Sequence, residues 1–69
     1  MTLAETVLAA LDQNAAARAR VGAARNQLMV TARVLVLAAD DAGVDRSTII
    51  AHSGLSRRTV YKMFAEAGR

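Results

Sequence analysis

The sequence predicts an all-α domain of about four helices. The chain has 69 residues, of which 54% are hydrophobic, with one tyrosine, one phenylalanine and no proline. Alanine and arginine, both frequent here, are among the strongest helix formers, whereas strands favour β-branched and aromatic residues. Apolar residues also recur at helical spacing, and polar residues suited to helix capping precede several of these runs.

The first predicted helix covers residues 3–21. Thr2 and Glu5 form a capping-box pattern, in which each side chain can satisfy a free backbone amide of the other. Apolar residues follow at helical spacing: Leu3, Val7, Leu8 and Leu11. Gly22 is either a break between two helices or a weak point in one long helix, so residues 3–40 could form one helix or two.

The second predicted helix covers residues 24–41. Its apolar face consists of Leu28, Met29, Ala32, Leu35, Val36 and Ala39. Gly43 follows where a helix C-cap commonly requires a left-handed residue.

Two short helices are expected next, at 46–53 and 56–67. Asp45 or Ser47 can cap the first, and Ser56 can cap the second. Between them, Gly54 is placed for a sharp turn, since glycine enters positive φ without a steric penalty. Leu55 is expected to fill the corner between the two helices.

Size and composition limit how the chain can be stabilised. A domain this small buries only about 60% of its unfolded surface, and small domains usually gain support from disulfides, a metal or oligomerisation. There is no cysteine, and the single histidine, His52, cannot build a zinc site alone. We therefore expect no metal and no cofactor, and we expect a homodimer.

The predicted organisation is one domain, 1–69, with an N-terminal helical element at 3–23 and a three-helix unit at 24–67. The first element is the candidate dimer interface, through Leu3, Val7, Leu11, Val21 and Leu28. A narrower stripe, from which Leu11 departs, follows alternating steps of four and three residues and could form a helical zipper with Asn14 setting the register. It consists of Leu3, Val7, Ala10, Asn14, Ala17, Val21, Ala24 and Leu28. The alternative is that this face covers the domain's own core.

Positive charge is concentrated in the last third of the chain. The formal net charge is +3; residues 1–44 are charge-balanced, so the whole excess lies in 45–69. This asymmetry indicates an anionic partner for the C-terminal end.

The segment 46–65 resembles the helix-turn-helix of bacterial repressors, in particular the tetracycline-repressor type, and of resolvase-type recombinases. The resemblance rests on the two isoleucines of the first helix, the turn glycine with Leu55 and Ser56 after it, and the run Thr59-Val60-Tyr61. Two positions depart from the repressor pattern: Ile50 replaces the usual alanine and Ser53 a small apolar residue.

The resemblance implies that the last helix enters the major groove of double-stranded DNA. The candidate DNA-binding residues are Arg46, Ser56, Arg57, Arg58, Thr59, Tyr61 and Lys62. Arginine can bond guanine bidentately, hydroxyl groups and lysine can contact phosphates, and Tyr61 can contact a phosphate or a thymine methyl. Arg46 is a phosphate candidate although a cation is unfavourable at a helix N-terminus.

The function expected from these features is a small repressor-like regulator that acts by occupying DNA. The alternative is a protein-interaction module, or an architectural or excision accessory protein, because a fold does not fix its use. No nucleophile–base pair, phosphate loop or ligand cluster points to an enzyme. A charge-balanced, alanine-rich first helix also suits a membrane surface poorly. We expect a cytoplasmic protein with no small-molecule ligand, since 69 residues leave no room for a sensing domain.

Overall fold

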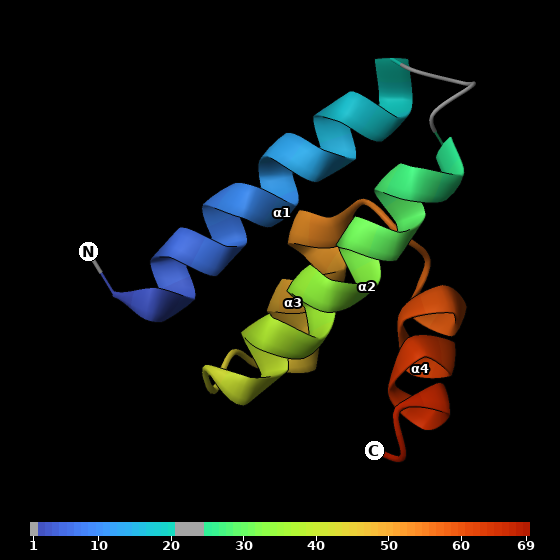
Figure 1. Ribbon diagram of the computed structural model, residues 1–69. Coiled ribbons are helices and arrows are strands. Elements are labelled where there is room, and N and C mark those ends of the chain that lie inside the picture. Colours follow the sequence, from blue (N-terminus) through green and yellow to red (C-terminus); the bar gives the residue numbers. More distant parts are fainter. Residues whose placement is uncertain (1, 21–24) are drawn as a thin grey trace.

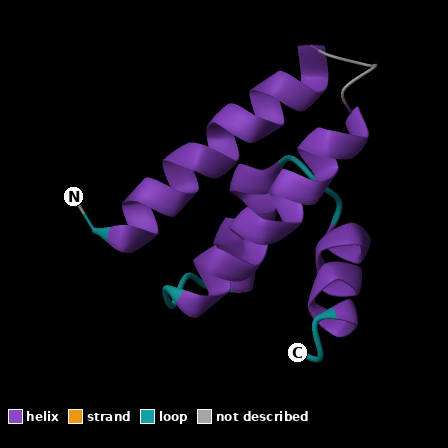
Figure 2. Ribbon diagram, in the orientation of Figure 1, coloured by secondary structure: helices purple, strands orange, loops and turns teal. Residues whose placement is uncertain are grey.

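The computed structural model contains four α-helices and confirms the predicted fold class. It describes residues 2–20 and 25–69, and within them there is no β-strand. The helices are α1 (Leu3–Arg20), α2 (Arg25–Asp41), α3 (Arg46–Ser53) and α4 (Arg57–Glu66) (Figures 1 and 2).

The long helices α1 and α2 lie side by side and run in opposite directions (Figure 1). Residues 3–41 are therefore two helices, which decides the question that the sequence left open. The predicted ends at Val21 and Ala24, and the break at Gly22, lie outside the described residues. The helix α2 stands between α1 and α4, and α3 packs against both α1 and α2.

Helix starts follow the capping residues of the sequence. The Thr2 hydroxyl accepts a hydrogen bond from the Glu5 amide at 3.1 Å. Asp45 rather than Ser47 caps α3, because the Asp45 carboxylate accepts from the Thr48 amide at 3.1 Å. A side-chain acceptor at this place satisfies one of the amides that the first helical turn leaves without a partner.

The ends of α2 and α4 share one glycine-dependent geometry. After α2, the amide of Gly43 donates to Asp40 and that of Val44 donates to Ala39, both at 3.0 Å. After α4, the amides of Gly68 and Arg69 repeat this pattern. Gly43 has a φ of 84° and Gly68 a φ of 78°. These are Schellman motifs, which use a left-handed residue to satisfy the last carbonyls of a helix.

All four helices contribute to a single core. Its fully or almost fully buried members are Val7, Leu11, Val36, Ala39, Ile49, Val60, Met63 and Phe64. Two of them, Val7 and Leu11, belong to the face of α1 from which the sequence predicted a dimer contact. The structure places both in the chain's own core, the alternative noted for this face. Of the other predicted contacts, Leu3 is exposed, Leu28 is half-buried and Val21 lies outside the described residues.

None of the helices in residues 2–20 and 25–69 is both long enough and apolar enough to cross a bilayer.

Candidate functional site

The chain reverses from α3 into α4 within three residues. Gly54 has a φ of 68°, as predicted for the turn. Leu55 is half-buried and packs against the core, as its corner position predicted. Ser53, one of the departures from the repressor pattern, is fully buried, and its hydroxyl donates to the Ile50 carbonyl and accepts from the Leu55 amide. The serine thus supplies polar contacts where an apolar residue could only pack.

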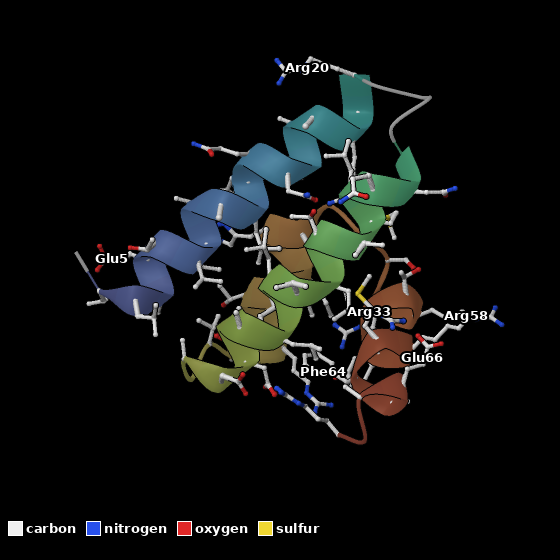
Figure 3. All side chains as sticks on the ribbon, in the orientation of Figure 1. Glu5, Arg20, Arg33, Arg58, Phe64 and Glu66 are labelled. Carbon is white, nitrogen blue, oxygen red and sulfur yellow. The ribbon has the colours of Figure 1, made fainter. Side chains whose placement is uncertain are left out.

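The helix α4 has one buried and one exposed face. Val60, Met63 and Phe64 are buried, in agreement with the spacing that predicted them as core. The exposed side chains of α4 are Arg57, Arg58, Tyr61, Lys62, Ala65 and Glu66, and we call the first four of these the α4 outer face. Figure 3 shows Arg58 directed away from the rest of the molecule.

The cationic side chains on and near α4 fall into two groups, those paired with a carboxylate and those without such a pair. Arg33 pairs with Glu66, and Arg69 lies 2.9 Å from carboxylate oxygens of both Asp40 and Asp41. These ion pairs tie α2 to α4 and to the chain end. In the described part of the chain, by contrast, Arg57, Arg58 and Lys62 have no ion pair. The outer face therefore keeps three positive charges that no carboxylate of the described residues pairs with, since the exposed Glu66 of the same helix is engaged by Arg33.

Arg46 lies against aromatic rings of α4. Its guanidinium carbon is 4.2 Å from the centroid of Phe64 and 5.2 Å from that of Tyr61. The two rings meet edge to face, with centroids 6.4 Å apart. Arg57 approaches the Tyr61 ring at 6.0 Å. The sequence predicted Arg46 as a phosphate contact and did not foresee this stacking, because the contact joins residues 15 and 18 positions apart.

The hydroxyls of Ser56 and Thr59 already interact with each other. Ser56 caps α4 by accepting from the Thr59 amide at 3.1 Å, and the two hydroxyl oxygens are 2.9 Å apart. Only one hydroxyl proton is used between them, so the other can still bond an external acceptor.

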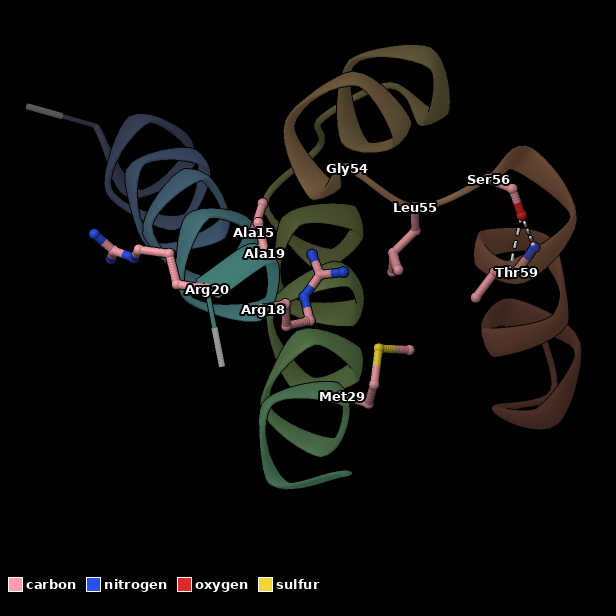
Figure 4. A pocket seen from close by; sticks show the side chains of 9 residues that line it. All are labelled: Ala15, Arg18, Ala19, Arg20, Met29, Gly54, Leu55, Ser56 and Thr59. Carbon is pink, nitrogen blue, oxygen red and sulfur yellow. Dashed lines mark hydrogen bonds between the residues drawn. The ribbon is translucent and has the colours of Figure 1, made fainter. Parts of the chain in front are cut away.

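An open groove of about 540 Å³ lies beside the start of α4. Ser56 and Thr59 line one side, Arg18 of α1 lines another, and Met29 and Leu55 supply apolar surface (Figure 4). Arg20, at the end of α1, also belongs to its lining (Figure 4).

Two contacts between α1 and α3 were not anticipated from the sequence. Asn14 accepts from Arg18 Nε at 2.7 Å, and Arg18 donates through Nη2 to the Ser53 carbonyl. His52 Nδ1 lies 2.7 Å from the Asp12 carboxylate, so this histidine is paired rather than an isolated surface residue. Nowhere in residues 2–20 and 25–69 do three His, Cys, Asp or Glu side chains come together as a metal site would require.

Comparison with protein-family models, with curated proteins and with solved structures returned no match for the chain.

Proposed function

We propose that this protein binds double-stranded DNA through the α4 outer face. The observation that carries the proposal is the set of three unpaired cations, Arg57, Arg58 and Lys62, on one exposed side of a short helix. Glu66, the one acidic residue of α4, pairs with Arg33 of α2 and not with these cations. A duplex carries a dense row of phosphates that such a surface neutralises, releasing counter-ions.

The local architecture supports recognition by α4 in the major groove. An eight-residue helix, a turn with a left-handed glycine and a serine-capped helix make a helix-turn-helix arrangement, in which the second helix reads base edges with its N-terminal residues. Arg57 and Arg58 occupy the first turn of α4 and are suited to guanine or phosphate. Lys62, one turn later, is suited to a phosphate.

The role that follows is that of a small repressor-like regulator acting as a homodimer. One α4 outer face offers few contacts, and helix-turn-helix proteins commonly double them by binding two half-sites about 34 Å apart. With Val7 and Leu11 in the core, a dimer contact has to use other surface.

The test is a titration of a fluorescent random-sequence duplex, followed by anisotropy between about 50 and about 200 mM salt. We expect the affinity of the wild-type protein to fall with salt, with a log–log slope of about −3 if three cations meet phosphates. Replacing Arg57 and Arg58 together by alanine removes two of them, so we expect a slope shallower by about two units and most of the affinity lost.

A matched pair of single variants controls for net charge. Arg58→Ala and Arg20→Ala each remove one exposed cation, but only Arg58 belongs to the α4 outer face. We expect Arg58→Ala to weaken binding by about tenfold and Arg20→Ala to leave it within about twofold. Equal losses would show that binding follows total charge and not α4, and no binding at low salt would refute the proposal.

A protein-interaction role is the second candidate, favoured by one observation. Val30 and Val34 on α2 are about three-fifths exposed and one helical turn apart, so their side chains share a face. Contiguous exposed apolar surface commonly marks a protein contact. A protein that fails to bind duplex DNA but is captured through this face would support the second candidate.

A further inference from the structure

We propose that Arg46 is a positioning residue, which holds Tyr61 on the α4 outer face by stacking rather than by bonding a phosphate itself. The inference rests on the proposed function and adds to it a residue outside α4 that prepares the binding surface. It also replaces the direct phosphate contact that the sequence suggested for Arg46.

The first step is the place of Arg46 against the core. Phe64 is fully buried, and the Arg46 guanidinium lies 4.2 Å from its ring centroid. This distance is within the range of a cation–π contact. A planar guanidinium can also stack on an aromatic ring, which a lysine ammonium cannot do. Arg46 is half-buried, so part of its side chain covers the Phe64 ring instead of extending into solvent.

The second step joins this contact to Tyr61. The same guanidinium lies 5.2 Å from the Tyr61 centroid, and the Tyr61 ring meets Phe64 edge to face at an interplanar angle of 67°. Tyr61 therefore lies between a fully buried ring and a cation, although 39% of its surface is exposed. An ordered side chain loses less conformational entropy when it meets a ligand, so stacking in the free protein favours binding.

The third step is electrostatic. Arg46 is the first residue of α3, where the helix dipole disfavours a cation. The stacked position gives it compensating contacts with electron-rich ring faces, and the Asp45 carboxylate adjoins it in the chain. Because these contacts hold Arg46, its side chain has less freedom to move toward a DNA phosphate.

Tyrosine emission offers a direct test, because the chain has one tyrosine and no tryptophan. Acrylamide quenching of the tyrosine emission and the tyrosine band of the near-ultraviolet circular dichroism of the free protein then report on Tyr61, apart from the bands of Phe64. We expect Arg46→Met, which keeps an apolar stem, to raise the quenching of Tyr61 and to reduce its dichroism. Arg57→Met, which removes a cation at 6.0 Å from the same ring, is the matched control and should change these signals less.

Duplex binding separates positioning from phosphate contact. If Arg46 acts through Tyr61, Arg46→Met should weaken binding by about threefold to tenfold with an unchanged salt slope. Arg46→Lys should fail to restore the affinity, since an ammonium does not stack as a guanidinium does. In a Tyr61→Leu background, Arg46→Met should have little further effect, because both variants remove one interaction.

Several results would overturn the inference. An unchanged Tyr61 signal in folded Arg46→Met, as judged by helical circular dichroism, would show that Arg46 does not hold the ring. A salt slope shallower by about one unit, with full rescue by Arg46→Lys, would make Arg46 a phosphate contact. The tyrosine signals need no DNA, so they decide the stacking even where duplex binding by the wild-type protein fails.

Discussion

Gly54 shows at the scale of one residue why the turn between α3 and α4 requires glycine. Its φ of 68° lies in the left-handed region, and a Cβ placed there would sit 3.3 Å from the Cβ of Ala15 on α1. The position therefore combines a backbone requirement with a close approach of another helix. Gly43 has a similar φ of 84° but open space around it, so it shares only the backbone requirement.

We expect Gly54→Ala to destabilise the protein more than Gly43→Ala. The left-handed conformation costs an alanine about 1–2 kcal/mol at either site. The contact with Ala15 adds strain only at Gly54. Urea denaturation of the two variants measures the difference. Ala15→Gly costs stability by itself because glycine is unfavourable inside a helix, but this cost should be smaller in the Gly54→Ala background than in the wild-type protein. Equal destabilisation of both single variants would contradict the role assigned to the α1 contact.

The pH dependence of Asp45 is a second prediction at this scale. The side-chain hydrogen bond from Thr48, followed by the backbone bond from Thr48, lowers the pKa of the Asp45 carboxyl below its ordinary value of 3.8. Because the folded pKa is the lower one, the ionised cap stabilises the fold above the unfolded pKa. This contribution is lost as the pH falls through the folded pKa.

Asp45→Asn isolates that contribution, because asparagine still caps a helix but does not titrate. We expect the wild-type protein to be the more stable at about pH 6 and to lose most of that advantage at about pH 3, as measured by urea denaturation. A stability difference that stays constant with pH would exclude an ionised Asp45 cap.

At the scale of elements, α1 supports the turn that orients α4. Asn14 is almost fully buried; its amide donates to the Leu28 carbonyl at 3.2 Å and its oxygen accepts from Arg18. Arg18 in turn donates to the Ser53 carbonyl at the end of α3. This chain of contacts links α1 and α2 to the residue before Gly54. The N-terminal helix is thus part of the framework behind the α4 outer face.

Asn14→Ala breaks this link, and we expect it to destabilise the protein by about 1–3 kcal/mol because buried polar groups lose their partners. Hydrogen exchange should also become faster at the Leu55 amide, which Ser53 holds at the turn. Gln13→Ala, at an exposed position of the same helix, is the control and should change little. An unaltered hydrogen-exchange rate at the Leu55 amide would show that α1 does not support the turn.

At the scale of the whole molecule, the proposed homodimer needs an exposed apolar surface. The large hydrophobic residues exposed in the described part of the chain are Leu3, Val30, Val34 and Tyr61. Among these, only Val30 and Val34 form a contiguous pair, and Val30 lines a shallow groove of about 250 Å³ together with Met29, Arg33 and Met63. The α4 outer face is cationic and repels a copy of itself.

We therefore expect Val34→Asp to weaken self-association, since burying a carboxylate in an apolar contact is strongly unfavourable. Leu3→Asp, at the other exposed apolar site, should have a smaller effect. Sedimentation velocity over a range of protein concentrations measures the self-association of both variants. Both substitutions are at exposed positions, so we expect the fold to stay intact. A wild-type protein that stays monomeric throughout would refute the homodimer, and a larger effect of Leu3→Asp would move the interface to α1.

The sequence alone determined the features that depend on neighbours along the chain. The helix caps Thr2 and Ser56, and the left-handed residues Gly43 and Gly54, were predictable because a cap or turn joins residues only a few positions apart. For α3 the sequence offered both Asp45 and Ser47 as the cap, and the structure decided for Asp45. The two faces of α4 were predictable for the same reason, since helical periodicity separates Val60 and Phe64 from Arg58.

Only the tertiary structure decided which surfaces meet. From sequence, the apolar face of α1 was predicted as a dimer contact, with the chain's own core as the alternative, and its burial against α2 and α3 placed Val7 and Leu11 inside. The Arg46 stacking and the Asn14–Arg18 link to Ser53 join residues far apart in the chain. Hydrophobic burial is non-directional, so a pattern specifies that a face is covered but not what covers it.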